Sequence, residues 1–296
     1  MRYISLCLLF LSTFANAKVV VQYYANEKQN TVTSEFYKSG LLFKHPNSQR
    51  TLRLVTLNWP PYISDSLCNN GWILQFVVAA LHQQNYNVHI EFMPWARAVR
   101  YVELGQADIL IPEYDIEHSA PSDNITNTTR LKLLALSAPF PGGALSFLKR
   151  KDDEFTFNGD LNSIKTRQLG VVRGYQNTPE LDAMIDNKLI EPVYAVDDFQ
   201  LVRLLAENRV DLIVGDPLVF QHSIINSNLD DEQKHALMQK LTPVGKQIAD
   251  KSLHFAISKR IPHWQRVLAD VNSSILAMKN NGELARLAHT PVRYCK

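Results

Sequence analysis

Short apolar strands alternate with amphipathic helices along this sequence, and the alternation restricts the fold more than any other feature. A strand at residues 52–57 is followed by a helical stripe from Trp72, a strand of alternating polarity at Asn87–Phe92, a helix starting at Pro94 and a strand at residues 108–111. Strands separated by helices favour a parallel sheet with right-handed crossovers. We therefore predict an α/β lobe, in which the alternating strand buries only its apolar face.

A second alternation of the same kind occupies the later part of the chain. Its strands are predicted at residues 131–136, 144–148, 168–172, 192–196 and 210–214. Two of its helices carry start signals, because Thr178 precedes a proline and an acid, and Asp197 precedes an apolar helical stripe. A strand at residues 253–257 and helices at residues 263–281 and up to Ala288 follow, and we expect them to return to the first lobe.

The predicted fold class is α/β with two lobes, each a mostly parallel sheet flanked by helices, joined by a two-segment hinge. We expect lobe 1 to comprise residues 51–140 and 253–296, and lobe 2 to comprise residues 145–248. Residues 18–50 contain two candidate strands and are predicted to form an N-terminal arm. The polar segment at residues 113–129 has no periodicity, and long loops of this kind are usually functional or mobile.

The N-terminus has the features of an export signal. Arg2 precedes an apolar run at residues 4–11, and a small-residue A-x-A cleavage site ends at Ala17. The apolar run is too short to span a bilayer. We predict a signal peptide at residues 1–17 and an exported, soluble mature chain, with an uncleaved anchor or a cytosolic N-terminal helix as the alternative.

The cysteine content then predicts one disulfide. Removal of the signal peptide takes away Cys7 and leaves Cys68 and Cys295. An even pair of cysteines in an oxidising compartment favours a disulfide bond. Two free thiols are the alternative.

Composition and motifs exclude several classes of function. The hydrophobic fraction of 46% and charged fraction of 20% are those of a globular protein. The net charge of +2 is too small to argue for nucleic acid or an anionic membrane as the main partner. The sequence has no G-x-S-x-G elbow, P-loop or G-x-G-x-x-G, and its nine histidines lack metal-site spacing. We therefore expect no catalytic residues, metal ion or cofactor.

The first predicted strand ends abruptly at an aromatic-proline turn. The stretch LRLVTLNWPPY places two prolines, which cannot continue a sheet ladder, between Trp59 and Tyr62. Open α/β sheets bind their ligands at the carboxyl ends of the strands. The turn therefore predicts one wall of a small-molecule cleft.

Several short motifs occur in a characteristic order between residues 52 and 288. They are LNWPPY after the first strand, PWARAV at the second helix, GQAD before the third strand, RLKLLALSAPF, GVVRGYQ and RVDLIVGD. In this order the chain resembles extracytoplasmic solute-binding proteins of the polar amino-acid-binding family (family 3) of ABC transporters. The resemblance implies a type II periplasmic-binding-protein-like fold, a periplasmic location, a small-molecule ligand, an ABC permease as the membrane partner and a monomer.

The resemblance also implies roles for individual residues. Trp59 and Trp95 match two aromatics that sandwich a ligand, Arg130 matches an arginine that binds a carboxylate, and Asp216 matches an acid that binds an ammonium. A guanidinium pairs with a carboxylate through two parallel hydrogen bonds, and an indole face holds an apolar stem or a cation. The expected ligand contacts are Trp59, Tyr62, Trp95, Arg97, Glu113, Arg130, Gly174, Tyr175 and Asp216.

Each of these residues has a structural alternative. The aromatic residues could simply belong to the core, and Arg97 could lie on a solvated helix face. Arg130 follows a polar segment and could be a surface charge, whereas Asp216 precedes a proline and could be only a helix N-cap.

Departures from the family pattern leave the ligand open. The second-lobe turn reads Gly174-Tyr175-Gln176 where a Gly-Thr pair is usual, and Glu113 adds charge where small residues are common. We expect an amino acid or a different small carboxylate, amine or peptide-like molecule. Two other functions remain as alternatives: presentation of the ligand to a membrane-bound signalling receptor, and a periplasmic enzyme on the same scaffold.

Overall fold

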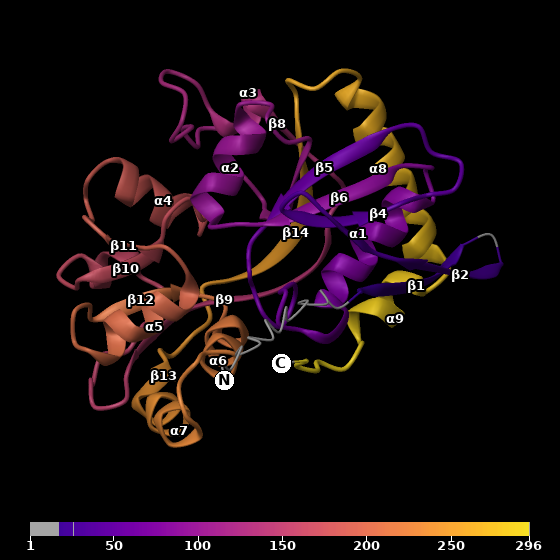
Figure 1. Cartoon of the computed structure of the whole chain (residues 1–296). Helices are drawn as coiled ribbons and strands as arrows, with labels where there is room; N and C mark the ends of the chain where they lie inside the picture. The colour runs from indigo at the N-terminus through magenta and orange to yellow at the C-terminus, as the bar shows by residue number, and fades with distance from the viewer. Residues whose placement is uncertain (1–17, 26, 296) are drawn as a thin grey trace, which may run out of the picture.

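Two lobes lie side by side and are joined by two long strands (Figure 1). The structure is a computed structural model that describes residues 18–25 and 27–295. The predicted signal peptide, with Cys7, lies outside the described residues. Among the residues that are described, no helix is long and apolar enough to cross a membrane.

Lobe 1 is built on a parallel core of three strands. β5 (Thr51–Thr56) pairs in parallel with β6 (Asn87–Phe92) on one side and with β7 (Ile109–Tyr114) on the other. Its helices are α1 (Trp72–His82), α2 (Trp95–Glu103), α8 (Trp264–Asn280) and α9 (Glu283–Ala288), together with the single turn of α3 (Arg130–Leu133). The strand–helix alternation of the sequence predicted this arrangement, including the return of the C-terminal helices to lobe 1, where α8 and α9 pack on α1.

The N-terminal segment forms two hairpins on lobe 1. β1 (Val20–Ala25) and β2 (Lys28–Thr33) make a separate two-stranded sheet, and β1 packs on α1. β3 (Glu35–Tyr37) and β4 (Gly40–Phe43) extend the main sheet, because β4 pairs antiparallel with β6.

This extension corrects the expectation that β6 buries only its apolar face. Both His89 and Glu91, on the opposite face, are more than nine-tenths buried. The imidazole of His89 lies 3.1 Å from the carbonyl oxygen of Tyr37, and the carboxylate of Glu91 accepts hydrogen bonds from Arg53 and Ser39. The polar face is therefore covered by neighbouring segments that satisfy its hydrogen bonds.

Lobe 2 repeats the parallel arrangement. β10 (Leu169–Val172) lies between β11 (Val193–Ala195) and β12 (Leu212–Gly215) and is parallel to both. Its helices are α4 (Pro179–Asp186), α5 (Asp198–Ala206), α6 (Pro217–Ile225) and α7 (Asp231–Lys240). The short strand β13 (Leu241–Pro243) pairs with β9 (Phe140–Arg150). The predicted N-caps are confirmed, since the side chains of Thr178 and Asp197 accept hydrogen bonds from the backbone of α4 and α5.

Two antiparallel strands connect the lobes and make the sheet continuous. β9 (Phe140–Arg150) and β14 (Ala249–Ser258) pair from Ala249 opposite Leu145 to Leu253 opposite Phe140. The full order of the sheet is β11-β10-β12-β9-β14-β7-β5-β6-β4-β3. This pair of strands passes between the two halves of Figure 1.

Around β9 the predicted elements need correction. Arg130–Leu133 is a helical turn instead of the start of a strand, and the strand β8 covers only Leu134–Leu136. β9 also runs without a break through residues 140–143, which were predicted to separate two strands. Gly142 permits this continuity, because a side chain there would collide with the carbonyl oxygen of Lys251 on β14.

The predicted disulfide is confirmed. Cys68 and Cys295 are bonded, with their Cα atoms 5.0 Å apart. The backbone of Leu67 pairs with that of Tyr294 beside the bond. The chain just after the aromatic-proline turn is therefore tied to the C-terminal segment.

Candidate ligand site

The aromatic-proline turn holds two rings against each other at the end of β5. The indole of Trp59 and the phenol of Tyr62 stack with centroids 4.5 Å apart. The backbone of Trp59 exchanges hydrogen bonds with Ile63, which closes the turn around the two prolines. Both rings belong to the core of lobe 1, and the Tyr62 hydroxyl also reaches Asp216 of lobe 2.

A small cavity lies between the lobes against this turn. Its volume is about 20 Å³, and it is lined by Leu57, Trp59, Trp95, Pro112, Glu113, Tyr114, Tyr175, Gln176 and Leu253. These residues come from the ends of β5 and β7, the start of α2, the turn after β10, and β14. A cavity of this size holds about one water molecule.

Three polar atoms at the cavity have no hydrogen-bond partner among the described residues. They are the indole Nε1 of Trp59, the hydroxyl of Tyr114 and the amide Oε1 of Gln176. Trp59 and Tyr114 are 4% and 7% exposed. A buried polar group without a partner costs about 1–3 kcal/mol, and native proteins retain few of them. Three of the residues that line this one cavity therefore carry an unpartnered polar atom, which makes the cavity a candidate binding site.

Arg130 is buried and already paired inside the protein. Its Nη2 donates to Glu113 Oε2 at 2.7 Å, and its Nε lies 3.6 Å from Glu103 Oε1. Its Nη1 reaches across to lobe 2 and donates to the carbonyl oxygen of Gly174 at 3.1 Å. Arg130 is 1% exposed, so the alternative of a surface charge is wrong.

Glu113 lies on β7, not in a surface loop as the polar segment suggested. The strand continues to Tyr114, and both residues are buried. One Glu113 oxygen accepts from Arg130 and the other from the amide of Tyr114. Burial raises the pKa of the Glu113 carboxyl to about 7, although the Arg130 guanidinium opposes the rise.

Asp216 caps α6 and also contacts lobe 1. Its Oδ1 accepts from the amide of Leu218 at 2.8 Å, which confirms the N-cap interpretation, and its Oδ2 accepts from the Tyr62 hydroxyl at 2.7 Å. Burial raises the pKa of this carboxyl. Gly143 on β9 makes room for the pair, because a side chain there would collide with both the carboxylate and the phenol oxygen.

Trp95 and the turn after β10 form a second contact between the lobes. The Trp95 indole donates to the carbonyl oxygen of Gly174 at 3.0 Å, and its ring meets Tyr175 edge-on at 6.0 Å. The Tyr175 hydroxyl donates to Asp198 Oδ2 at 2.8 Å. The positive φ of Gly174 (85°) suits glycine and lets the backbone approach the indole.

Sequence reasoning missed Asp198 and Gln176 as members of this region. Asp198 is 2% exposed, and burial raises its pKa to about 7. Asp198 directly follows Asp197, whose side chain caps the same helix. The cap explained the acid at Asp197, and no sequence signal indicated a separate role for Asp198. The sequence marks Gln176 only as part of the turn that departs from the usual Gly-Thr pair, and this departure is the one signal that could have identified Gln176 as a site residue.

Arg97 lies apart from the cavity. Its side chain is exposed on α2 and borders a groove of about 440 Å³ between the lobes, together with Asp197 and Asp198. This groove shares Leu57 and Trp95 with the cavity. The solvated-face interpretation fits its exposure better than contact with a ligand in the central cavity.

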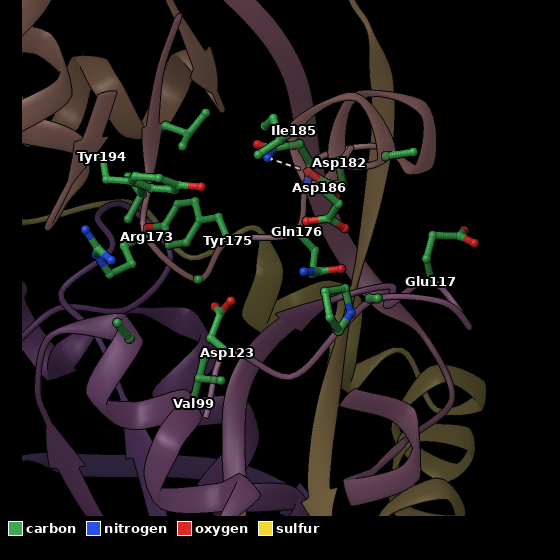
Figure 2. A pocket seen from close by; sticks show the side chains of 18 of the residues that line it. Val99, Glu117, Asp123, Arg173, Tyr175, Gln176, Asp182, Ile185, Asp186 and Tyr194 are labelled. Carbon is green, nitrogen blue, oxygen red and sulfur yellow. Dashed lines mark hydrogen bonds between the residues drawn. The ribbon is translucent and has the colours of Figure 1, made fainter. Parts of the chain in front are cut away.

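A larger groove of about 670 Å³ opens between the lobes beside Tyr175 and Gln176. Figure 2 shows Asp182, Asp186 and Tyr194 of lobe 2 on one side and Asp123 and Val99 of lobe 1 on the other. Burial raises the pKa of Asp182 to about 6 and, with the charge of Asp123 opposite, also raises that of Asp186. The groove is therefore acidic, and Arg173 is the cation on its wall.

No set of three His, Cys, Asp or Glu side chains within residues 18–25 and 27–295 is arranged to hold a metal ion.

Comparison with known proteins decides the fold. No family model and no curated protein matches the sequence. Solved structures do match. A histidine kinase sensor domain with similarity to periplasmic binding proteins superposes with a TM-score of 0.65 at 17% identity, over 83% of this chain and 98% of that one. The chain has the periplasmic-binding-protein fold.

Two binding proteins with this fold are similar over almost their whole length. An ancestral arginine-binding protein bound to arginine matches with a TM-score of 0.63 at 17% identity, covering 81% of this chain and 97% of that one. An arginine 3rd transport system periplasmic binding protein from Legionella pneumophila matches with a TM-score of 0.60 at 15% identity, covering 81% and 98%. Because the identities are this low, the structural likeness establishes the fold alone, which is the fold that the motifs predicted.

Proposed function

We propose that this protein captures a small polar ligand, an amino acid or a related molecule, between its two lobes. The observation that carries the proposal is that three residues lining one aromatic cavity at the lobe interface, Trp59, Tyr114 and Gln176, each have a buried polar atom without a partner among the described residues. A ligand supplies the hydrogen bonds that these buried groups lack.

Ligand entry requires the lobes to separate. The cavity of about 20 Å³ is far smaller than the ~300–1,000 Å³ of ordinary small-molecule sites. Among the described residues, the polar contacts that hold the lobes together include those from Tyr62 to Asp216, from Trp95 and Arg130 to Gly174, and between His222 and Tyr294. The paired strands β9 and β14 would act as the hinge, so that opening breaks these contacts and closure around a ligand restores them.

The cellular role that fits best is delivery of the ligand in the periplasm to an ABC-type importer. The export signal and the disulfide support a periplasmic location. The likeness to a periplasmic binding protein of an arginine transport system supports a transport role. Presentation of the ligand to a membrane-bound signalling receptor is the second candidate, favoured by the likeness to a histidine kinase sensor domain.

A thermal-shift screen of amino acids, amines and small acids tests ligand capture. A ligand at 100 times its Kd adds about 2.7 kcal/mol to the free energy of unfolding. Tyr114→Phe removes an unpartnered hydroxyl, so the folded protein should be as stable as the wild type or more stable, while ligand affinity falls roughly threefold to tenfold. Tyr23→Phe, which changes a buried tyrosine of lobe 1 away from the cavity, is the matched control.

Two outcomes would contradict ligand capture at this cavity. One is a broad screen that produces no shift in melting temperature. The other is a ligand whose affinity falls equally in Tyr114→Phe and in Tyr23→Phe.

Transport and sensing differ in the membrane partner. Site-specific cross-linking of the ligand-bound protein in membranes, followed by mass spectrometry, identifies that partner. Transport predicts a permease subunit in the cross-linked product, whereas a histidine kinase or cyclase in its place would establish the sensing role.

A further inference from the structure

We infer that the ligand is a small organic cation that carries a neutral oxygen acceptor and no free carboxylate. The inference rests on the proposed function and specifies its ligand. Amino alcohols and amino acid amides have this chemistry, whereas zwitterionic amino acids do not. Four features of the described residues lead to it.

The first feature is that the guanidinium expected to bind a ligand carboxylate already has carboxylates of the protein beside it. Arg130 is held by Glu113 at 2.7 Å and approached by Glu103 at 3.6 Å, and its side chain is 2% exposed. A ligand carboxylate would lie beside Glu113 and Glu103, which repel it, and it could take the place of Glu113 only by breaking a buried ion pair. Breaking a buried ion pair in this way is strongly unfavourable.

The second feature is the aromatic lining of the cavity. Trp59, Trp95, Tyr114 and Tyr175 contribute rings, and the aliphatic side chain of Leu253 lies beside them. Aromatic faces attract cations that have been removed from water, and this is how proteins recognise alkylated ammonium groups. The lining therefore suits a cationic head-group better than an anionic one.

The third feature is the identity of the unpartnered atoms. Gln176 Oε1 can only accept a hydrogen bond, which an ammonium N–H supplies. The Tyr114 hydroxyl can accept or donate. Trp59 Nε1 can only donate, so it requires an acceptor on the ligand. An amide or hydroxyl oxygen meets that requirement without the charge of a carboxylate.

The fourth feature is an excess of negative charge around the cavity. Asp216 and Asp198 lie directly behind Tyr62 and Tyr175, whose hydroxyls donate to them at 2.7 and 2.8 Å. The carboxyl groups of Glu103, Glu113, Asp198 and Asp216 contact Arg130, Tyr175 or Tyr62, and all four residues are more than nine-tenths buried. The cations are Arg130 and Lys251, whose ammonium lies 5.0 Å from the Tyr114 ring centroid. Acidic side chains thus outnumber basic ones here, and a cation beside them would favour the ionised forms of Glu113 and Asp198, whose pKa values burial raises.

The acidic groove beside the cavity extends this charge to the surface. Glu117 and Asp123 from lobe 1 face Asp182 and Asp186 from lobe 2, and the groove includes Tyr175 and Gln176 (Figure 2). Its cation, Arg173, is directed over the ring of Tyr194 at 4.8 Å. A cleft lined by one sign of charge concentrates ligands of the opposite sign.

Matched compounds that differ only at the carboxylate test the inference. Calorimetric titration at pH 7.5 would compare leucine, leucinamide and 3-methylbutylamine, and likewise arginine, argininamide and agmatine. We expect the amide of at least one set to bind about tenfold or more tightly than its acid, and the amine, which lacks the acceptor oxygen, to bind less tightly than the amide.

The failures of the inference and of the proposed function are distinguishable. An acid that binds as tightly as its amide, or a ligand with a free carboxylate found in the wider screen, overturns the inference and leaves ligand capture intact. If neither these compounds nor the wider screen gives binding, the proposed function fails as well.

Two variants test the charge argument directly. Glu113→Gln frees the guanidinium of Arg130, so the preference for amide over acid should fall by about tenfold. Asp216→Asn keeps one oxygen that can accept from the Leu218 amide and places an amide NH2 group beside the Tyr62 hydroxyl oxygen, which can accept from it. The change removes a charge, so cation binding should weaken roughly threefold to tenfold even if Glu113→Gln does not fold. The inference would be overturned if Asp216→Asn bound the cation with the same affinity as the wild type and the Tyr23→Phe control.

Discussion

The substitution Asp198→Asn should make the protein more stable at pH 8 and bind its ligand less tightly. Asp198 is 2% exposed, and its Oδ1 has no hydrogen-bond partner among the described residues. Burial raises the pKa of its carboxyl from 3.8 to about 7, and the charges of Asp197 and Asp216 act in the same direction. Asparagine keeps an oxygen that accepts from the Tyr175 hydroxyl.

The size of the effect follows from the pKa shift. Each pKa unit corresponds to about 1.4 kcal/mol, so a shift from 3.8 to about 7 sets an upper limit of roughly 4 kcal/mol for the cost of the ionised carboxylate in the folded state. Relaxation and water entry reduce such costs. We therefore expect Asp198→Asn to raise the free energy of unfolding by about 1–3 kcal/mol at pH 8.

The sign of the pH dependence is fixed by the same shift. Because the folded pKa is higher than the unfolded one, the folded protein binds more protons between pH 4 and 7, and wild-type stability falls as the pH rises through that window. Below pH 4 the carboxyl becomes protonated in both states, so the advantage of the variant should disappear there.

Urea unfolding of wild type and Asp198→Asn across pH 4 to 8 measures the difference. Thermal unfolding at pH 8 is a second measurement, in which the melting temperature should rise by roughly 2–4 °C for each kcal/mol gained. The reasoning is refuted if the variant is less stable than the wild type at pH 8, or if its advantage is the same at pH 4 and pH 8.

Two further variants test the hinge region and the disulfide. In Gly143→Ala the new methyl group would collide with the Asp216 carboxylate and the Tyr62 hydroxyl, so the closed form should be disfavoured. X-ray scattering should then show a larger radius of gyration than that of the wild type. An unchanged radius of gyration with unchanged ligand affinity would contradict this prediction. Replacing both Cys68 and Cys295 with alanine should lower the free energy of unfolding by roughly 2–5 kcal/mol; a wild type whose denaturant midpoint does not respond to reductant would count against that cost.

The fold was predictable from the sequence because its signals are local. Strand–helix alternation, the N-cap at Thr178 and the apolar β5 each depend on a few neighbouring residues, and the structure has each of them. The errors occur where tertiary contacts decide. The polar face of β6 is buried because Tyr37 and Ser39 of the β3–β4 hairpin and Arg53 of β5 contact it, and the sequence of β6 itself does not indicate these contacts.

The candidate site was predictable in its aromatic walls but not in its electrostatics. Trp59 was expected from its place at the aromatic-proline turn and Trp95 from the family resemblance, and both line the cavity. The motif that suggested Arg130 contained no information about its counter-ion. Glu113 is 17 residues away in sequence and meets the guanidinium only because β7 extends further than its apolar run.

A crystal structure of the complex with the tightest ligand tests the central claim most directly. We predict that the ligand lies between the rings of Trp59 and Trp95, with hydrogen bonds to the Tyr114 hydroxyl and to Gln176. A ligand bound instead in the groove of about 480 Å³ beside the disulfide, which includes Gln22 and Gln75, would contradict the account.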